Sequence, residues 1–264
     1  MNYFEKKITS KTMSFRYAIG NTINSGNEIH PFHEILYYID GDATFTSDSF
    51  KTNLTKGSLI IIPKECYHQF IVKNQDKYKR LVINFYDVPE LDNLISKSMI
   101  SIKIFDAPNT HITNMLNRTI SVLNEDYEKD DVCSYLYGTL ICILFELNVS
   151  ELKSVPLVKR ENTDTISMCI DYINSHFSEK ILLKDIADEI NCSVSTLQHT
   201  FRKEMGISIY KYITEKRLIK AYNLLNRNFK PTQVYYDCGF GDYASFYKAY
   251  TKMFGTSPKH NADI

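Results

Sequence analysis

The 264-residue chain lacks several features that would place it in a special class of protein. It has no tryptophan, only nine glycines and only seven prolines, so it is neither collagen-like nor of low complexity. With 44% hydrophobic and 23% charged residues, disorder and a long coiled coil are also excluded. The 31 basic residues balance the 31 acidic ones. This neutrality argues against nucleic-acid binding, which usually appears as a basic excess.

The cysteines and the apolar runs exclude further classes. No two of the six cysteines lie within four residues of each other, so the spacing of a zinc ribbon or a thioredoxin motif is missing. Residues 1–11 are polar and have no signal-peptide core. The most apolar run, residues 140–149, contains Glu146 and is shorter than the ~18 residues of a membrane span. We therefore expect a cytoplasmic protein with reduced thiols and no membrane partner.

The first part of the chain has the pattern of short β-strands. Six segments are rich in β-branched and aromatic residues, and turn sequences such as IDGD, TKG and KNQD separate them. Strands at this spacing predict an all-β barrel or sandwich. The six segments are residues 13–20, 34–40, 43–50, 58–62, 67–72 and 80–86.

Helical spacing replaces the strand pattern from Asn109 onward. Apolar residues between Ile112 and Leu123 fall on one helix face. A second helix is predicted for Val132–Leu147, and it is apolar almost all round. Such a helix belongs in a core or in a subunit interface, and both alternatives stay open. We expect residues 109–147 to pair two subunits in a homodimer.

A segment without periodicity, which contains Pro156, divides the chain. The predicted domains are residues 1–150 and 163–264, joined by a linker over 151–162. The charge is also divided: residues 1–159 carry 17 basic and 19 acidic side chains, whereas residues 202–264 carry 11 basic and five acidic ones. The overall neutrality hides a basic C-terminal stretch, although such a stretch is often only a solvated face.

Residues 181–201 have the pattern of a helix-turn-helix. Ile186 and the small Ala187 give the first helix an apolar face that a second helix can cross closely. Asn191 suits a tight turn with positive φ, and Ser193 suits the N-cap of the next helix. An ordinary helical hairpin would also fit this pattern.

The same pattern recurs in residues 233–250. Gly239 occupies the turn, and Phe246 and Tyr250 take the inward-facing positions that Leu197 and Phe201 hold in the first helix-turn-helix. Between the two patterns, residues 208–225 predict one long helix that can hold two DNA-reading helices apart.

Residues 170–258 resemble the DNA-binding domain of the AraC/XylS transcription regulators. The resemblance implies two helix-turn-helix units joined by the long helix, each placing a recognition helix in a major groove of double-stranded promoter DNA. The matching residues are Ile186-Ala187, Ser193, Leu197, Phe201-Arg202-Lys203, Gly206, Ser208, Tyr212-Ile213, Arg217-Leu218, Ala221, Leu224-Leu225, Gly239-Phe240, Asp242, Phe246, Phe254-Gly255 and Pro258.

Two faces are therefore expected to contact DNA. Helical spacing turns polar residues of the first recognition helix outward, where they suit base edges and phosphates. The family has a small alanine at Tyr235, an apolar residue at Pro231 and Tyr-Arg after Pro258, so we expect more sequence information from the first unit. The predicted contacts are Ser195, Thr196, Gln198, His199, Arg202 and Lys203 in the first unit and Tyr243, Ala244, Ser245 and Lys248 in the second.

The strand region contains histidines and a glutamate near predicted strand starts. His30, His33, Glu34 and His68 could form a metal site, a polar effector pocket or a set of structural histidines. The spacing resembles the cupin double motif of the AraC-type sensor barrel, but the two histidines are one residue too far apart and Glu65 stands where cupins have glycine. We favour the effector pocket, and we predict no metal and no cofactor.

Strand alternation and the resemblance to the sensor barrel add further residues to the predicted pocket. Arg80 suits an anionic or polyhydroxyl effector, such as a sugar, because its planar fork binds carboxylates and hydroxyls. The predicted effector-binding residues are His30, His33, Glu34, Tyr38, Asp40, His68, Phe70, Arg80 and Asn84.

The prediction is an α+β two-domain protein with an N-terminal cupin-like β-barrel carrying two helices and a C-terminal all-α double helix-turn-helix. We interpret it as a sequence-specific DNA-binding transcription regulator, not an enzyme, that responds to a small-molecule effector and contacts RNA polymerase if it activates. Two alternatives stay open. One is a metal-dependent cupin enzyme with a helical appendage, and the other is a constitutive DNA-binding dimer with a non-sensing barrel.

Overall fold

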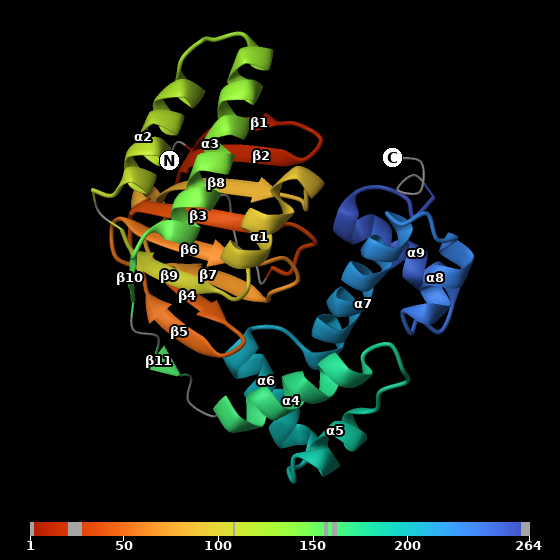
Figure 1. Ribbon diagram of the computed structural model, residues 1–264. Coiled ribbons are helices and arrows are strands. Elements are labelled where there is room, and N and C mark those ends of the chain that lie inside the picture. The colour runs from red at the N-terminus through yellow and green to blue at the C-terminus, as the bar shows by residue number, and fades with distance from the viewer. Residues whose placement is uncertain (1–2, 21–27, 108, 156–157, 160–162, 260–264) are drawn as a thin grey trace. The chain divides into compact units, whose positions relative to one another are not determined.

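The chain divides into two units, Met1–Val158 and Lys159–Ile264, each of which is described by itself (Figure 1). The structure is a computed structural model that describes residues 3–20, 28–107, 109–155, 158–159 and 163–259. Part of the predicted linker, residues 156–157 and 160–162, lies outside the described residues. Within the range expected as linker, Lys153–Ser154 forms strand β10 and pairs with β9, Lys103–Asp106. The first unit therefore extends beyond residue 150.

The first unit is built on two β-sheets. Adjacent strands whose register the structure gives are antiparallel, as in most barrels and sandwiches with short connections. The larger sheet has the order β1 (Phe4–Thr9), β2 (Met13–Ile19), β8 (Lys79–Phe85), β3 (His33–Asp40), β6 (Ser58–Ile62), β9, β10. The smaller sheet has the order β11 (Val158–Lys159), β5 (Phe50–Asn53), β4 (Ala43–Ser47), β7 (His68–Val72).

Side chains alternate between two apolar cores across the larger sheet. On β3, Ile35 and Tyr37 belong to the core against the helices, whereas Leu36 and Tyr38 belong to the core between the two sheets. Because both faces of β3 are covered, nearly all of its residues are buried. The helices on the first face are α1 (Asp92–Ser98), α2 (His111–Asn124) and α3 (Lys129–Val149), and Figure 1 shows them lying over the sheet.

The sequence-based prediction of the first unit was incomplete in four places. Strand β1 was missed because its side chains are mostly exposed polar groups and it is held at the sheet edge by pairing with β2. Strand β9 has four residues and α1 has seven, which are too short for a periodicity to show. The predicted strand 43–50 is two strands, β4 and β5, which pair with each other. The barrel therefore carries three helices rather than two.

From Thr163 to Lys259, all the regular secondary structure that the structure describes in the second unit is helical. Short helices α5 and α8 each precede a longer helix across a tight turn, and α7 links the two pairs. The helices are α4 (Thr163–His176), α5 (Leu183–Glu189), α6 (Val194–Met205), α7 (Ile209–Leu225), α8 (Pro231–Asp237) and α9 (Tyr243–Phe254). The expected double helix-turn-helix is confirmed.

The two helix-turn-helix units use the same local devices. Asn191 has φ +54° in the first turn and Gly239 has φ +83° in the second. The side chain of Ser193 accepts a hydrogen bond from an amide of α6, and Asp242 does the same for α9, which satisfies a free amide at each helix start. Both helices end at a glycine in the left-handed conformation, Gly206 and Gly255.

Two basic residues of α7 bind the loop between α4 and α5, and one of them also binds the end of α8. Arg217 donates to the carbonyls of Phe177 at 2.6 Å and Glu179 at 2.7 Å. Lys220 donates to Ser178 Oγ at 2.8 Å and to the carbonyl of Asp237, at the end of α8, at 3.0 Å. The loop after α4 and the end of α8 are thus held together through α7, all within the second unit. Two of the basic side chains counted in residues 202–264 therefore act inside the fold.

Candidate nucleic-acid interface and ligand pocket

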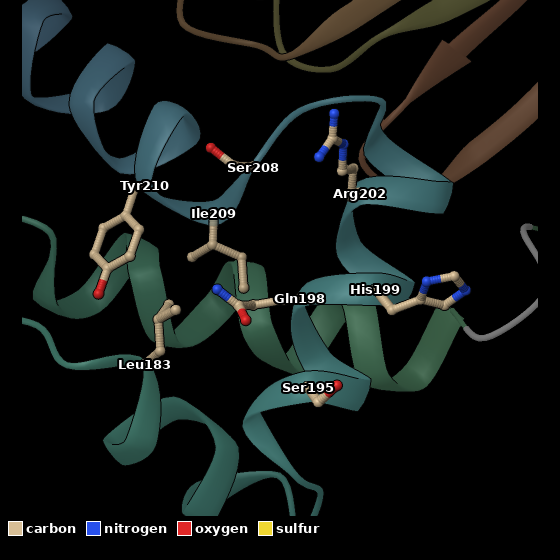
Figure 2. Close-up of a pocket in the computed structure, with 8 residues that line it drawn as sticks. All are labelled: Leu183, Ser195, Gln198, His199, Arg202, Ser208, Ile209 and Tyr210. Atoms are coloured by element: carbon tan, nitrogen blue, oxygen red, sulfur yellow. The ribbon is translucent and has the colours of Figure 1, made fainter.

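Helix α6 presents a polar face above a buried support. Leu197 and Phe201 are fully buried, whereas Gln198, His199 and Arg202 are exposed. This difference follows from the 3.6-residue helical repeat, which places the apolar pair on one side. Side chains of α6 and the start of α7 border a hollow of about 380 Å³, shown in Figure 2. Its lining residues are Leu183, Ser195, Gln198, His199, Arg202, Ser208, Ile209 and Tyr210.

Helix α9 presents a smaller polar face. Ala244, Ser245 and Lys248 are exposed, and the Ser245 hydroxyl lies 2.8 Å from the Asp242 cap. Tyr243 is half-buried because its ring packs edge-on against Tyr235, with centroids 5.7 Å apart. The large residue at the position of the family's alanine is thus accommodated by an aromatic contact, which takes Tyr243 partly out of the exposed face.

Three predicted residues meet deep inside the first unit. His30, Glu34 and His68 are each at most 6% exposed, and one ligand atom from each lies within 4.8 Å of the others. His30 Nε2 lies 3.5 Å from Glu34 Oε2. Burial raises the pKa of the Glu34 carboxyl, but His30 and His68 outweigh it and hold that pKa below its usual range. Burial lowers the pKa of His68 to about 4, so its ring is neutral at pH 7.

Further polar atoms lie between the two sheets. Tyr38 Oη and Asn84 Oδ1 are buried and have no hydrogen-bond partner among the described residues. Arg80, which pairs with Tyr38 in register, donates to the carbonyl of Gly20 at 2.7 Å and lies 4.4 Å from the centre of the Tyr78 ring. Phe70 packs edge-on against His68. A buried polar atom without a partner costs free energy, so these atoms suit a polar ligand or water.

Two predicted pocket residues do not join this group. His33 is on the opposite face of β3 because neighbouring strand residues alternate, and it bonds Asp87 at 2.9 Å instead. Asp40 follows an irregularity in the pairing of β3 with β8, lies at the end of the strand and binds Lys56 at 2.8 Å. The prediction that both line the interior is therefore corrected. Thr46, whose buried Oγ1 has no partner among the described residues, was missed because a threonine in a strand has no distinctive spacing.

Both units match known protein families. Residues 13–131 match the AraC-like ligand binding domain, and residues 186–262 match a helix-turn-helix domain. The two matches cover most of both units and follow the order that the fold shows.

Curated relatives give the same picture over different lengths. The Msm operon regulatory protein of Streptococcus mutans is 25% identical over 92% of this chain and 86% of its own length. The HTH-type transcriptional activator RhaS of Citrobacter koseri is 32% identical over 44% of this chain and 43% of its own length. Among solved structures, ToxT from Vibrio cholerae aligns over 99% of this chain and 97% of its own, with 12% identity and a TM-score of 0.41.

The matched domains agree with the geometry described above. The first unit is a β-rich domain with several buried polar side chains, and the second presents an exposed polar helix on a capped helix-turn-helix. The chain belongs to the AraC-type transcription regulators, with an AraC-like ligand-binding domain followed by a helix-turn-helix DNA-binding domain.

Proposed function

We propose that the chain reads promoter DNA chiefly through α6. The exposed, polar outer face of this helix carries the proposal. Gln198 can form paired hydrogen bonds with an adenine edge, and Arg202 can bind guanine or phosphate. Ser195 and His199 border the same hollow and extend that face. Thr196 is also exposed, but its hydroxyl lies 2.8 Å from Ser193 Oγ at the helix start, which favours a supporting role.

We assign a weaker contribution to α9. Lys248 suits a phosphate because it is exposed and carries a mobile charge. Ala244 offers a small apolar surface that can contact a thymine methyl group. The contacts of Tyr243 with Tyr235 and of Ser245 with Asp242 reduce what these two side chains can offer to DNA.

The direct test is a footprint with the purified full-length chain on DNA upstream of its own operon. Two recognition helices in successive major grooves should protect roughly two helical turns per subunit. A binding-site selection on randomised DNA then shows which base positions are read. Absence of protection at low salt on every upstream fragment would contradict the proposal.

We infer that the interior of the first unit binds a small polar effector. Unpartnered atoms of Tyr38 and Asn84 and the remaining donors of Arg80 support a polyhydroxyl or anionic compound. A thermal-shift screen with sugars and organic acids tests this, because a ligand that binds only the folded state raises its stability. Replacing Asn84 with alanine should remove the shift, whereas replacing the exposed His111 should not.

We also propose a homodimer formed through α3. Beyond its buried side, the helix exposes Tyr135, Gly138, Cys142, Phe145 and Val149, which follow each other at intervals of three and four residues. This repeat is that of a coiled-coil seam. By length and composition α3 could also cross a membrane, but its other side is packed in the core of the first unit. A second copy of the helix therefore suits the exposed side better.

The remaining parts of the proposal follow from the relatives. A relative named as a transcriptional activator supports a role in activation, with RNA polymerase as a further partner. The chain would act in the cytoplasm, where promoter DNA is found, and as a regulator rather than an enzyme. Transcription from the footprinted promoter, with and without the chain, distinguishes an activator from a repressor.

A further inference from the structure

His30, Glu34 and His68 form a buried cluster that DNA reading does not use. Two imidazoles and a carboxylate converge on one point from the loop before β3, from β3 itself and from β7. The two histidine rings lie with their centres 5.0 Å apart. Backbone pairing of Glu28 with His68 brings a second carboxylate to the cluster, with Glu28 Oε2 3.9 Å from His68 Nε2.

Hydrogen bonds fix which ring nitrogens carry protons. His30 Nδ1 lies 2.8 Å from the carbonyl oxygen of Phe32, and His68 Nδ1 lies 3.1 Å from that of Cys66. A carbonyl oxygen only accepts, so each Nδ1 carries the hydrogen. The Nε2 atoms of both rings are buried and have no hydrogen-bond partner among the described residues. When the rings are neutral, both Nε2 lone pairs are left near carboxylates: His30 Nε2 is 3.5 Å from Glu34 Oε2, and His68 Nε2 is 3.9 Å from Glu28 Oε2.

A proton on a histidine ring or a bound metal ion can satisfy this arrangement, and a single metal ion satisfies both rings at once. Lone pairs and carboxylate oxygens repel one another, and burial removes the water that would otherwise solvate them. Tetrahedral ligands at about 2.0–2.2 Å stand roughly 3.3 Å apart. His30 Nε2 is 3.5 Å from Glu34 Oε2, and all three ligand atoms lie within 4.8 Å of one another, so a small inward movement would complete the site.

Aromatic side chains hold the two imidazoles in place. The Phe32 ring stacks on His30 at 4.0 Å, and the Phe45 ring stacks on His68 at 6.2 Å. Together with the carbonyl acceptors at both Nδ1 atoms, this is the outer support that metal-binding histidines use to fix tautomer and orientation.

We propose that His30, Glu34 and His68 bind one divalent transition-metal ion of the zinc, iron(II), cobalt or nickel class. Imidazole nitrogen selects these ions over calcium and magnesium, which prefer oxygen. Three protein ligands leave open coordination positions for water or an oxygen atom of a small ligand. This proposal differs from the prediction of no metal, and the titration below distinguishes the two. Metal binding here does not depend on DNA binding, so the two can fail separately.

The test is a titration of the chelator-treated, full-length chain with Co²⁺, followed by visible absorption and calorimetry. We expect one Co²⁺ per chain. Because each ligand supplies a direct bond, Glu34→Gln and His68→Gln should each weaken binding by about 100-fold or more. His111→Asn removes an exposed histidine of the same unit and should bind Co²⁺ like the parent chain.

A second readout needs no variant. In the Co²⁺-loaded parent chain, proton NMR should show two exchangeable, paramagnetically shifted resonances from the Nδ1–H groups of His30 and His68. Less than about 0.1 Co²⁺ per chain would overturn the proposal, since a built site binds near stoichiometrically. Unchanged affinity in a folded Glu34→Gln variant would overturn it too, because the ion would then be bound elsewhere. DNA footprinting of each variant reports separately on the second unit.

Discussion

Gln198 and Lys203 both project from α6 and are both exposed, but they offer different chemistry to DNA. An amide can read a base edge with two directed hydrogen bonds, whereas an ammonium group acts mainly as a point charge on phosphate. Sequence specificity and salt sensitivity should therefore be separable within one helix.

Replacing Gln198 with alanine should remove base reading at one position. We expect a loss of about 1–3 kcal/mol on the preferred site and relaxed selection at that base pair only. Lys203→Ala is the matched control, which should weaken binding on all sequences and reduce the salt dependence. Binding-site selection with both variants measures the difference. Unchanged base discrimination in the glutamine variant would show that the helix lies in another register.

Glu215 gives a pH prediction for the second unit. Burial raises the pKa of its carboxyl to about 7, and the contact with Lys211 opposes this only in part. Because the pKa of the folded state exceeds that of the unfolded chain, the protonated group stabilises the fold at low pH, and this is lost as the pH rises through about 7. At pH 4, Glu215→Gln should have the same free energy of unfolding as the parent chain. At pH 8 its free energy of unfolding should be about 2 kcal/mol higher, because the variant buries no charge.

Urea unfolding at the two pH values measures this difference. The exposed Glu189→Gln variant serves as the control and should behave like the parent chain at both. An equal effect of Glu215→Gln at pH 4 and pH 8 would mean that the carboxyl is not the titrating group.

At the scale of elements, the turn of the second helix-turn-helix requires a glycine at position 239. A Cβ at Gly239 would lie 2.6 Å from the carbonyl oxygen of Ser178, and the residue has φ +83°. Gly255 has a similar φ of +72°, but its Cβ would meet nothing within 4 Å. Substitutions at the two glycines therefore distinguish two costs: alanine at Gly255 adds backbone strain alone, whereas alanine at Gly239 adds both strain and a steric clash.

Gly255→Ala should cost about 1–2 kcal/mol, the penalty for a left-handed L-residue. Gly239→Ala should cost a further 1–3 kcal/mol, roughly, because the backbone of Ser178 cannot rotate away. Thermal unfolding of both variants gives the comparison. Equal losses would show that the loop after α4 moves freely and does not fix the turn.

The exposed seam of α3 gives a second prediction at this scale. Cys142 lies at its centre, so in an antiparallel two-fold pair it would face its own copy. Mild oxidation should then produce a disulfide-linked dimer that Cys142→Ser abolishes. Cys133→Ser is the control because that half-buried residue is not on the seam. Phe145→Lys should shift the chain to monomer in sedimentation, and a monomeric parent chain would contradict the interface.

At the scale of the whole molecule, neutrality is an average over two unlike units. The basic excess lies in residues 202–264, although Arg217 and Lys220 are bound to backbone carbonyls inside the fold. The charge available to phosphates is therefore smaller than a count suggests. Affinity should depend on a limited number of phosphate contacts.

DNA affinity should accordingly fall about 100-fold or more between 50 and 200 mM salt, because each neutralised phosphate releases counterions. Fluorescence anisotropy with a labelled operator fragment measures the slope. A fragment of random sequence is the control, and it should show a similar slope at weaker affinity. An affinity that is insensitive to salt would contradict a phosphate-based interface.

Local patterns were sufficient for the second unit. The turn at Asn191, the cap at Ser193 and the long helix after Ser208 were all predicted and are confirmed. Each depends on neighbours a few residues apart, where the conformational preferences of single residues decide. The clamp from Arg217 and Lys220 could not be predicted, because its partners lie up to 42 residues away and are mostly backbone carbonyls without a sequence signal.

The sequence by itself determined the two-part organisation, the helix-turn-helix repeat and the family, because helix caps, turns and strand alternation act over short distances. Only the tertiary structure decided which polar residues meet inside the first unit. His33 and Glu34 are adjacent in the chain, yet alternation sends one toward Asp87 and the other toward His30 and His68. Strand register and the path of the loops determine which of these side chains come into contact, and both depend on how the whole chain packs.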